Sequence, residues 1–399
     1  MRLNPTHAIF DGNMFVQLRA LLDEVTPPAD LPLLDMSVGE PQQPPSPLLL
    51  ESVARHNDKW QFYPKAVGNP RFISVIEAYI ARRWPEAAGL AHPDQIIPVP
   101  GTREPLHFLG HLVTGSKANA IALVSNPYYH AWRAGALASG GETVFLNAGA
   151  NHNFLPDLAS LDSSLLDRTN ILYLCSPTNP QGSVMDLDYL TNALALARQH
   201  DFLLVMDECY SDIWRGSPPT GMMQAAAALA KAGMIAGDDP LANMVVLNSL
   251  SKRSGAAGLR AGFMVGDRTV ITQYLKLVAN GGSLVPMPLL EVAADLYDDE
   301  DHVIDIRAYY DANFRLVEKH LGVTPPDGGF FLWLKVDDDI EFVKKLMREQ
   351  AVRALPGSFM AIETEDGNPG AGYVRLALVH DAATTDAALA RIAAVYRAG

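Results

Sequence analysis

Short, continuously apolar runs recur through the middle of the chain and alternate with longer stretches of helical periodicity, such as residues 189–200. An apolar run without polar interruption is typical of a strand buried on both faces. The alternation predicts an α/β unit whose mostly parallel sheet is covered by helices. The predicted strands are 96–99, 121–125, 143–146, 171–174, 202–206, 244–248 and 262–265.

The pattern changes after about residue 290. A long helical stretch, 290–320, precedes two strand candidates, 330–336 and 373–379, which have helices around them. This order predicts a second, smaller α+β unit. We therefore predict an N-terminal arm with part of the small domain in 1–50, a large domain in 51–289 and a C-terminal small domain in 290–399.

Two further segments have a clear local character. The Pro-rich stretch 41–47 predicts an extended arm, because proline fixes φ and removes a backbone donor. The Ala- and Met-rich stretch 221–233 predicts a helix whose small residues serve packing.

Composition narrows the possible functions. The 399 residues include 45 acidic and 31 basic side chains, a net charge of −14, and no basic cluster. This balance disfavours binding to nucleic acid or to anionic membranes. Apolar residues make up 48% of the chain, which excludes a disordered protein.

Cys175 and Cys209 are the two cysteines of the chain. They can define neither a disulfide framework nor a four-cysteine metal site, and we predict no metal. No apolar run reaches the roughly 20 residues of a membrane span, and the first residues lack the apolar core of a signal peptide. A cytoplasmic location is expected.

Polar residues that follow the predicted strands are the first candidates for chemistry, because open α/β sheets bind ligands at the carboxyl ends of their strands. Lys252 follows one such strand, between the hydroxyls of Ser249 and Ser251 and eight residues before Arg260. A solvated loop lysine is the common interpretation of such a residue. A lysine beside a phosphate site formed by these hydroxyls and the arginine would suit Schiff-base chemistry.

Asp207 directly follows another apolar run, and Tyr210 lies three residues later. In isolation the aspartate would be interpreted as a helix N-cap and the tyrosine as a core residue. Alternatively, the carboxylate pairs with a pyridine nitrogen, raises the pKa of that nitrogen and keeps the ring protonated.

Three turns complete the set of candidates. Asn179 lies between two prolines, Pro177 and Pro180, whose isomers the sequence leaves open. A Gly-Thr-Arg turn at 101–103 opens a predicted helix and offers free N–H groups to an anion. Tyr129 follows a further strand and either stacks on a planar ring or packs in the core.

In this order on one α/β chain, the segments NPYY (126–129), SPTNPQG (176–182), DECY (207–210) and SLSK (249–252) resemble the class I/II aminotransferases. These are pyridoxal-phosphate enzymes of the aspartate-aminotransferase fold, fold type I. The resemblance runs from SVGEP near residue 37 to YVRLAL near residue 373. It implies a large domain with a mostly parallel central sheet and a smaller α+β domain.

The resemblance also implies a role for each matching residue. Lys252 is expected to form the Schiff base with the cofactor and to move the proton, and Asp207 to hold the pyridine nitrogen. Tyr210 and Asn179 are expected on the ring oxygen, and Tyr129 stacked on the ring. The expected phosphate site is Gly101, Thr102, Arg103, Ser249, Ser251 and Arg260, and the expected contacts to the substrate carboxylate are Arg375, Asn179 and the backbone of Gly39.

Tyr63, in the segment YPKAVGNP, resembles a family tyrosine that reaches the phosphate of a neighbouring subunit. The resemblance therefore implies a homodimer with shared active sites. The segment departs from the family pattern, because Phe72 and Ile73 stand where a Leu-Arg pair is common. Gln181 likewise stands where threonine is common.

Several stretches, including GTRE and SLSKRS, resemble bacterial succinyldiaminopimelate aminotransferases of lysine biosynthesis, which take glutamate as amino donor and follow ping-pong kinetics. A distal carboxylate then needs a cation, and Arg253, Arg103, Lys65 and Arg133 are the candidates. Other amino-acid specificities and a fold type I lyase remain alternatives. A transcription regulator and a cofactor-free binding protein fit less well, because the first lacks a DNA-binding extension and the second does not need this set of residues.

Overall fold

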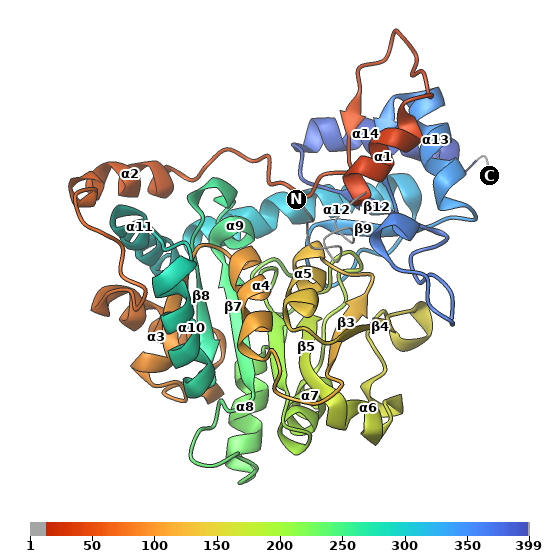
Figure 1. The fold of residues 1–399 in the computed structure, drawn as a ribbon. Coiled ribbons are helices and arrows are strands. Elements are labelled where there is room, and N and C mark those ends of the chain that lie inside the picture. Colours follow the sequence, from red (N-terminus) through yellow and green to blue (C-terminus); the bar gives the residue numbers. More distant parts are fainter. Residues whose placement is uncertain (1–12, 398–399) are drawn as a thin grey trace, which may run out of the picture.

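The computed structural model describes residues 13–397. Its centre is a seven-stranded sheet with strand order β2-β8-β7-β6-β5-β3-β4 (Figure 1). The neighbours from β4 to β7 pair in parallel, whereas β8 is antiparallel to both β7 and β2. The predicted, mostly parallel α/β sheet is confirmed. Its strands are β2 (Ile96–Val99), β3 (Ile121–Asn126), β4 (Glu142–Asn147), β5 (Thr169–Cys175), β6 (Leu203–Asp207), β7 (Met244–Ser249) and β8 (Gly262–Gly266).

Helices cover both faces of this sheet, since alternate side chains of the central strands belong to two separate cores. Leu172 and Leu204 join one core, and Tyr173 and Val205 join the other. Burial on both faces explains why these strands read as unbroken apolar runs. The helices of this unit are α2 (Pro47–Arg55), α3 (Pro70–Arg83), α4 (Arg103–Leu112), α5 (His130–Ala138), α6 (Ser163–Arg168), α7 (Leu187–Gln199), α8 (Met222–Lys231), α9 (Leu250–Arg253), α10 (Arg268–Gly281) and α11 (Met287–Asp298).

The second unit has its own core, to which both ends of the chain contribute (Figure 1). A three-stranded antiparallel sheet has the order β11-β12-β9, and β1 pairs in parallel with β10. The strands are β1 (Leu34–Asp35), β9 (Phe331–Lys335), β10 (Val352–Arg353), β11 (Leu355–Pro356) and β12 (Tyr373–Ala377). The helices are α1 (Met14–Leu22), α12 (Asp301–Leu321), α13 (Asp339–Gln350) and α14 (Ala382–Tyr396).

The predicted helical stretch 290–320 is two helices, α11 and α12, separated at Asp299 and Glu300. Asp299 has extended backbone, and its side chain accepts a hydrogen bond from the backbone N–H of His302. Leu290 and Tyr297 of α11 belong to the larger core. The larger core thus includes α11, and the predicted boundary at residue 290 falls inside this helix.

In the Pro-rich stretch, residues 41–46 contain no helix or strand, and α2 begins at Pro47. The helix predicted in 221–233 is α8, with Met222 and Met223 fully buried. Among the described helices, none has the length and apolar character that a membrane span needs.

Candidate active site

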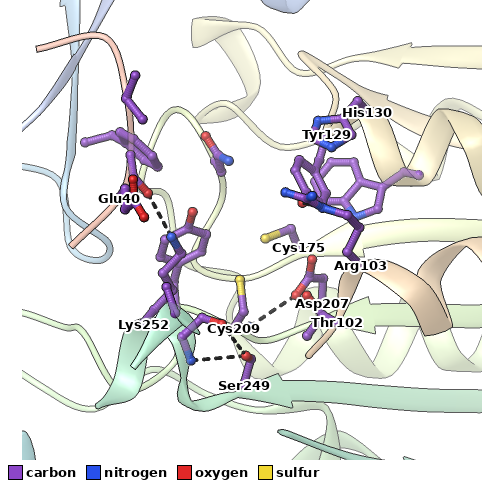
Figure 2. A pocket seen from close by; sticks show the side chains of 18 of the residues that line it. Glu40, Thr102, Arg103, Tyr129, His130, Cys175, Asp207, Cys209, Ser249 and Lys252 are labelled. Carbon is purple, nitrogen blue, oxygen red and sulfur yellow. Dashed lines mark hydrogen bonds between the residues drawn. The ribbon is translucent and has the colours of Figure 1, made fainter. Parts of the chain in front are cut away.

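A cavity of about 490 Å³ lies where β5, β6 and β7 end, and the second unit contributes part of its wall. Figure 2 shows residues that line it. The predicted residues that line it are Gly39, Thr102, Arg103, Tyr129, Asn179, Asp207, Tyr210, Ser249, Ser251, Lys252, Arg260 and Arg375.

Lys252 is brought to the cavity by the short helix α9, which starts immediately after β7. Ser249 caps this helix, with its Oγ accepting a hydrogen bond from the backbone N–H of Ser251. The Nζ of Lys252 donates to the carbonyl oxygen of Gly39 at 2.8 Å. Burial lowers the pKa of Lys252 to about 8, and the nearby cations Arg375 and Arg103 act in the same direction. The interpretation as a solvated loop lysine is therefore wrong.

Asp207 is the last residue of β6, and its side chain is 3% exposed. The residues after it form a turn, so it does not cap a helix. Its Oδ1 accepts a hydrogen bond from the backbone N–H of Cys209 at 3.3 Å. Burial raises the pKa of Asp207 to about 6. A cation at this position would offset the cost of keeping the carboxylate ionised.

Tyr210 follows on the same turn and lies edge-on against Phe330 and Phe331, which enter from the second unit. Burial raises the pKa of Tyr210 well above its usual value, so its hydroxyl keeps its proton at neutral pH.

A cluster of hydroxyl and guanidinium groups lines one end of the cavity. The Oγ of Ser249 donates to the Oγ of Ser251 at 2.9 Å, and Nη1 of Arg260 donates to the latter oxygen at 3.3 Å. Nη2 of Arg260 donates to the carbonyl oxygen of Pro100 at 3.0 Å, which joins this cluster to the turn before α4. Several donors and the start of a helix in one place suit a phosphate.

Gly101 forms the close point of that turn. Its φ is +76°, and a Cβ at this position would lie 2.5 Å from Nη2 of Arg260. Thr102 then leads into α4. The glycine is needed both for the left-handed backbone and for the space that the guanidinium occupies.

Arg375, on β12, lies at the opposite wall and is 3% exposed. Its Nη2 donates to the carbonyl oxygen of Ser37 at 2.8 Å, and its Nη1 donates to Oδ1 of Asn179 at 3.3 Å. Its Nε has no hydrogen-bond partner among the described residues. Burial lowers the pKa of Arg375 to about 10, so the group is still charged at neutral pH and can receive an anion.

Tyr129 lies across the cavity from Lys252, beside His130 and Arg103 (Figure 2). Its hydroxyl accepts a hydrogen bond from Nε of Arg103 at 3.1 Å. The two terminal nitrogens of Arg103 have no hydrogen bond to any described residue. A planar aromatic ring and a cation that can accept a ligand therefore occupy the same wall.

The structure does not bring every predicted residue to the cavity. Tyr63 is 93% exposed and lies outside it. Arg253 is fully buried and paired with Glu300, so its proposed role as the cation for a distal carboxylate is wrong. Lys65 is exposed and lines neither this cavity nor the neighbouring one. The peptide bonds before Pro177 and Pro180 are both cis.

Arg133 lines a neighbouring cavity of about 1250 Å³ that shares Arg103, His130 and Arg260 with the first. Its Nη1 donates to the hydroxyl of Tyr128 at 3.2 Å. Arg133 thus lines the neighbouring cavity only, whereas Arg103 lines both cavities.

Sequence reasoning missed other residues that line the cavity. Signals were available for two of them, because Glu40 follows Gly39 and Cys209 lies inside the DECY segment. Phe331 gave no local signal, since it comes from a distant strand and lies under the Arg375 guanidinium at 4.3 Å. The missed residues are Met14, Phe15, Val38, Glu40, His130, Trp132, Cys175, Cys209, Ala257, Gly258 and Phe331.

The residues present fit a phosphate-bearing pyridine aldehyde. A part-buried amine, a buried carboxylate at a strand end, a hydroxyl and guanidinium cluster and an aromatic ring share one cavity. Among residues 13–397, no group of three or more His, Cys, Asp or Glu side chains could hold a metal ion.

Comparison with known proteins agrees with this set. The family model described as aminotransferase class I and II matches residues 32–392. The crystal structure of an aminotransferase from Neisseria meningitidis is 32% identical, with a TM-score of 0.89, and covers 97% of this chain and 98% of its own. A probable aminotransferase of Mycobacterium tuberculosis is 28% identical over 90% of this chain and 80% of its own length. An LL-diaminopimelate aminotransferase of Gloeobacter violaceus is 26% identical over 87% and 86%. The chain belongs to the class I and II aminotransferases, which are pyridoxal-phosphate enzymes.

Proposed function

We propose that this aminotransferase moves the amino group of glutamate to a keto acid that carries a second, distal carboxylate, by a ping-pong mechanism. The observation that carries this proposal is that, besides Arg260 at the expected phosphate site, two arginines line the Lys252 cavity, Arg375 on one wall and Arg103 on another. Glutamate and diaminopimelate derivatives both carry two carboxylates, and an arginine fork suits each of them.

When bound, pyridoxal phosphate supplies an aldehyde that condenses with an amine and a ring that withdraws electrons from the reacting carbon. Lys252 would hold the aldehyde carbon and move a proton at Nζ. Asp207 would pair with the ring nitrogen, and Tyr210 and Asn179 would hydrogen-bond the ring oxygen. Tyr129 would stack on the ring.

The phosphate would be held by Thr102, the backbone of Gly101 and Arg103, Ser249, Ser251 and Arg260. Arg375 would bind the α-carboxylate of the substrate, with Asn179 and the backbone of Gly39 beside it. Lys252 and Gly39 are neighbours in this cavity, because the Nζ of Lys252 donates to the Gly39 carbonyl oxygen at 2.8 Å.

Arg103 is the candidate cation for the distal carboxylate. Its terminal nitrogens are free of described partners, and it lines the Lys252 cavity, whereas Arg253 is buried elsewhere. Arg103→Met should weaken binding of glutamate by about ten- to hundredfold, because a charge-assisted hydrogen bond contributes roughly 1.5–3 kcal/mol. Binding of L-alanine, which has no distal carboxylate, should change little.

Half-reaction kinetics with each amino acid, followed by cofactor absorbance, measure this difference. Arg133→Met is the matched control, because that arginine lines the neighbouring cavity. An equal loss for glutamate and L-alanine would show that Arg103 supports the cofactor rather than the distal carboxylate.

For the amino product of this transfer we propose N-succinyl-LL-diaminopimelate, so that the accepting keto acid is its keto analogue; LL-diaminopimelate is the alternative product that the names of several relatives favour. The reverse reaction, in which each compound donates its amino group to 2-oxoglutarate, distinguishes the two. Turnover of LL-diaminopimelate alone would assign to this chain the reaction for which those relatives are named.

We also propose a homodimer in which Tyr63 completes the partner's phosphate site. Residues 50–67 expose several large apolar side chains, a pattern that marks an interaction surface. They are Leu50, Val53, Trp60, Phe62, Tyr63 and Val67.

A further inference from the structure

A cluster of charged residues, mostly buried, includes Arg253, the residue after Lys252, and none of its members lines the Lys252 cavity. We name Arg83, Glu208, Asp212, Arg253 and Glu300 the charge cluster. Glu208, Asp212 and Arg253 are almost fully buried, with Arg253 at 0% and Asp212 at 2% side-chain exposure, and the side chain of Arg83 is 9% exposed. The cluster comes from α3, from the turn after β6, from α9 and from the segment after α11, so it joins elements far apart in the sequence (Figure 1).

Arg253 immediately follows Lys252, and it is tied to two other parts of the chain. Its Nη2 donates to Oε1 of Glu300 at 2.7 Å and to the carbonyl oxygen of Asp299 at 3.2 Å. Its Nε lies 4.0 Å from Oδ2 of Asp212. These contacts fix the C-terminal end of the helix that carries Lys252.

Asp212 belongs to the turn that carries Asp207 and Tyr210. Its Oδ2 accepts a hydrogen bond from the hydroxyl of Tyr79 at 2.9 Å, and its Oδ1 lies 3.5 Å from Nε of Arg83. The Arg253–Asp212 pair therefore links the segment of the reactive amine to the segment of the ring-holding carboxylate.

Asn248 makes a second link between the same segments. Its Nδ2 donates to the carbonyl oxygen of Glu208 and to Oγ of Ser211, both at 3.2 Å. Its Oδ1 accepts a hydrogen bond from the hydroxyl of Tyr297 at 2.9 Å. The two links act on neighbouring strands, since β6 pairs with β7.

Stability alone does not account for this cluster, because a buried ion pair is often no more stabilising than well-packed apolar residues. Nε and Nη1 of Arg253 and Oδ1 of Asp212 have no hydrogen-bond partner among the described residues. What the cluster does supply is a link between the segment that carries Lys252 and the segment that carries Asp207, the two residues that would hold the cofactor ring.

We propose that Arg253 is a positioning residue that, through Asp212 and Glu300, sets the place of Lys252 relative to Asp207. The proposal rests on the proposed function of the cavity. Arg253 touches neither substrate nor cofactor, and its effect reaches the site through the backbone of α9. Positioning matters because small displacements of a reacting group cost large factors in rate.

The test compares Arg253→Met with Arg82→Met. Arg82 binds the same Glu300 oxygen at 2.8 Å from the surface and makes no contact with Asp212. Arg253→Met should slow the half-reaction with saturating glutamate by about tenfold or more while changing glutamate affinity less, and it should shift the pH midpoint of the cofactor absorbance. Arg82→Met should leave all three as in the wild type.

A readout without cofactor separates positioning from chemistry. In the cofactor-free protein, hydrogen exchange of a peptide spanning 249–253 should speed up in Arg253→Met, whereas a peptide spanning 121–126 in β3 should not change. Arg253→Lys should recover part of the rate, because it keeps the charge without the fork that reaches Glu300 and Asp299.

The proposal would be overturned if Arg253→Met had the hydrogen exchange, cofactor absorbance and half-reaction rate of the wild type. It would also be overturned if Arg82→Met changed these three properties as much as Arg253→Met does. If Arg253→Met fails to fold, Arg253→Lys and Asp212→Asn decide: wild-type values in both would overturn the proposal. A wild-type protein that never responds to glutamate would instead contradict the proposed function.

Discussion

Burial of Lys252 disfavours the charged form of its amine, and the neutral form is the one that reacts as a nucleophile. The pKa of about 8 means that an appreciable fraction of the side chain is deprotonated slightly above neutral pH. A free lysine with its ordinary pKa near 10.4 would be almost fully protonated there. The cavity thus supplies a nucleophilic amine near neutral pH.

The pKa of Glu208, the residue after Asp207, shifts in the opposite direction to that of Lys252. Burial raises its pKa to about 7, with Asp212 and Asp207 adding to the shift. Between about pH 4.5 and pH 7 the folded state binds more protons at Glu208 than the unfolded state does, so this group lowers stability as pH rises through that window.

Glu208→Gln should therefore be more stable than the wild type at pH 8, by up to about 3 kcal/mol, and lose that advantage towards pH 4.5. The amide can still accept the hydrogen bond that Oε1 of Glu208 receives from the backbone N–H of Met222. Urea unfolding of the cofactor-free protein across this pH range measures the difference. Glu318→Gln, on the exposed face of α12, is the matched control for a Glu-to-Gln change at the surface. A difference in unfolding free energy between Glu208→Gln and the wild type that does not change with pH would contradict the raised pKa of Glu208.

Single residues were predictable where strand ends fix their position. Asp207 and Lys252 follow apolar strands, and parallel strands end at one edge of the sheet, so both were expected at one site. Arg253 was not predictable in this way. Its burial depends on Asp212 and Glu300, which come from distant parts of the chain, and from the sequence it was predicted only as a candidate cation for a distal carboxylate.

Among the elements, the turn before α4 places a steric demand at the expected phosphate site. Gly101 combines φ of +76° with a close approach of Arg260. Gly115 has a similar φ of +72°, but a Cβ added there would meet no described atom within 4 Å. Substitutions at the two glycines can therefore be compared: both introduce a side chain at positive φ, but only the one at Gly101 fills the space beside Arg260.

Gly101→Ala should lose affinity for pyridoxal phosphate, because the new methyl group displaces the guanidinium of Arg260. Both Gly101→Ala and Gly115→Ala should lose about 1 kcal/mol or more of stability, since alanine disfavours positive φ. Titration of cofactor-free protein with pyridoxal phosphate measures the difference. Comparable affinity in the two variants would contradict the steric role of Gly101.

Element boundaries were less predictable than element types. The apolar strands were found because burial on both faces leaves a plain signal. The break between α11 and α12 was missed, because the acidic run 298–301 reads as an exposed helical face, whereas Asp299 in fact receives the N–H of His302.

For the whole molecule, the main expectation is an active site shared between two chains. Tyr63 lies outside the cavity of its own chain and is 93% exposed. If it serves the partner's site, a Tyr63→Ala chain and a Lys252→Ala chain have complementary defects. Each hybrid dimer then has one site with both residues intact.

Equal mixing of these two inactive or weakened variants by co-expression should restore about one quarter of wild-type turnover, because half of the dimers are hybrid and each has one intact site. Sedimentation of the wild type checks that the protein is a dimer. Activity no higher than the average of the two separate variants would contradict a shared site.

The most direct test of the central claim is the visible spectrum of the purified protein with pyridoxal phosphate, before and after L-glutamate is added without any keto acid. We predict an absorbance band of the Lys252-bound cofactor that glutamate removes. Lys252→Ala should lack the initial band, whereas Lys276→Ala, an exposed lysine on α10, should behave as the wild type. A wild-type protein that takes up no cofactor, or a Lys252→Ala variant with an unchanged spectrum, would contradict the account.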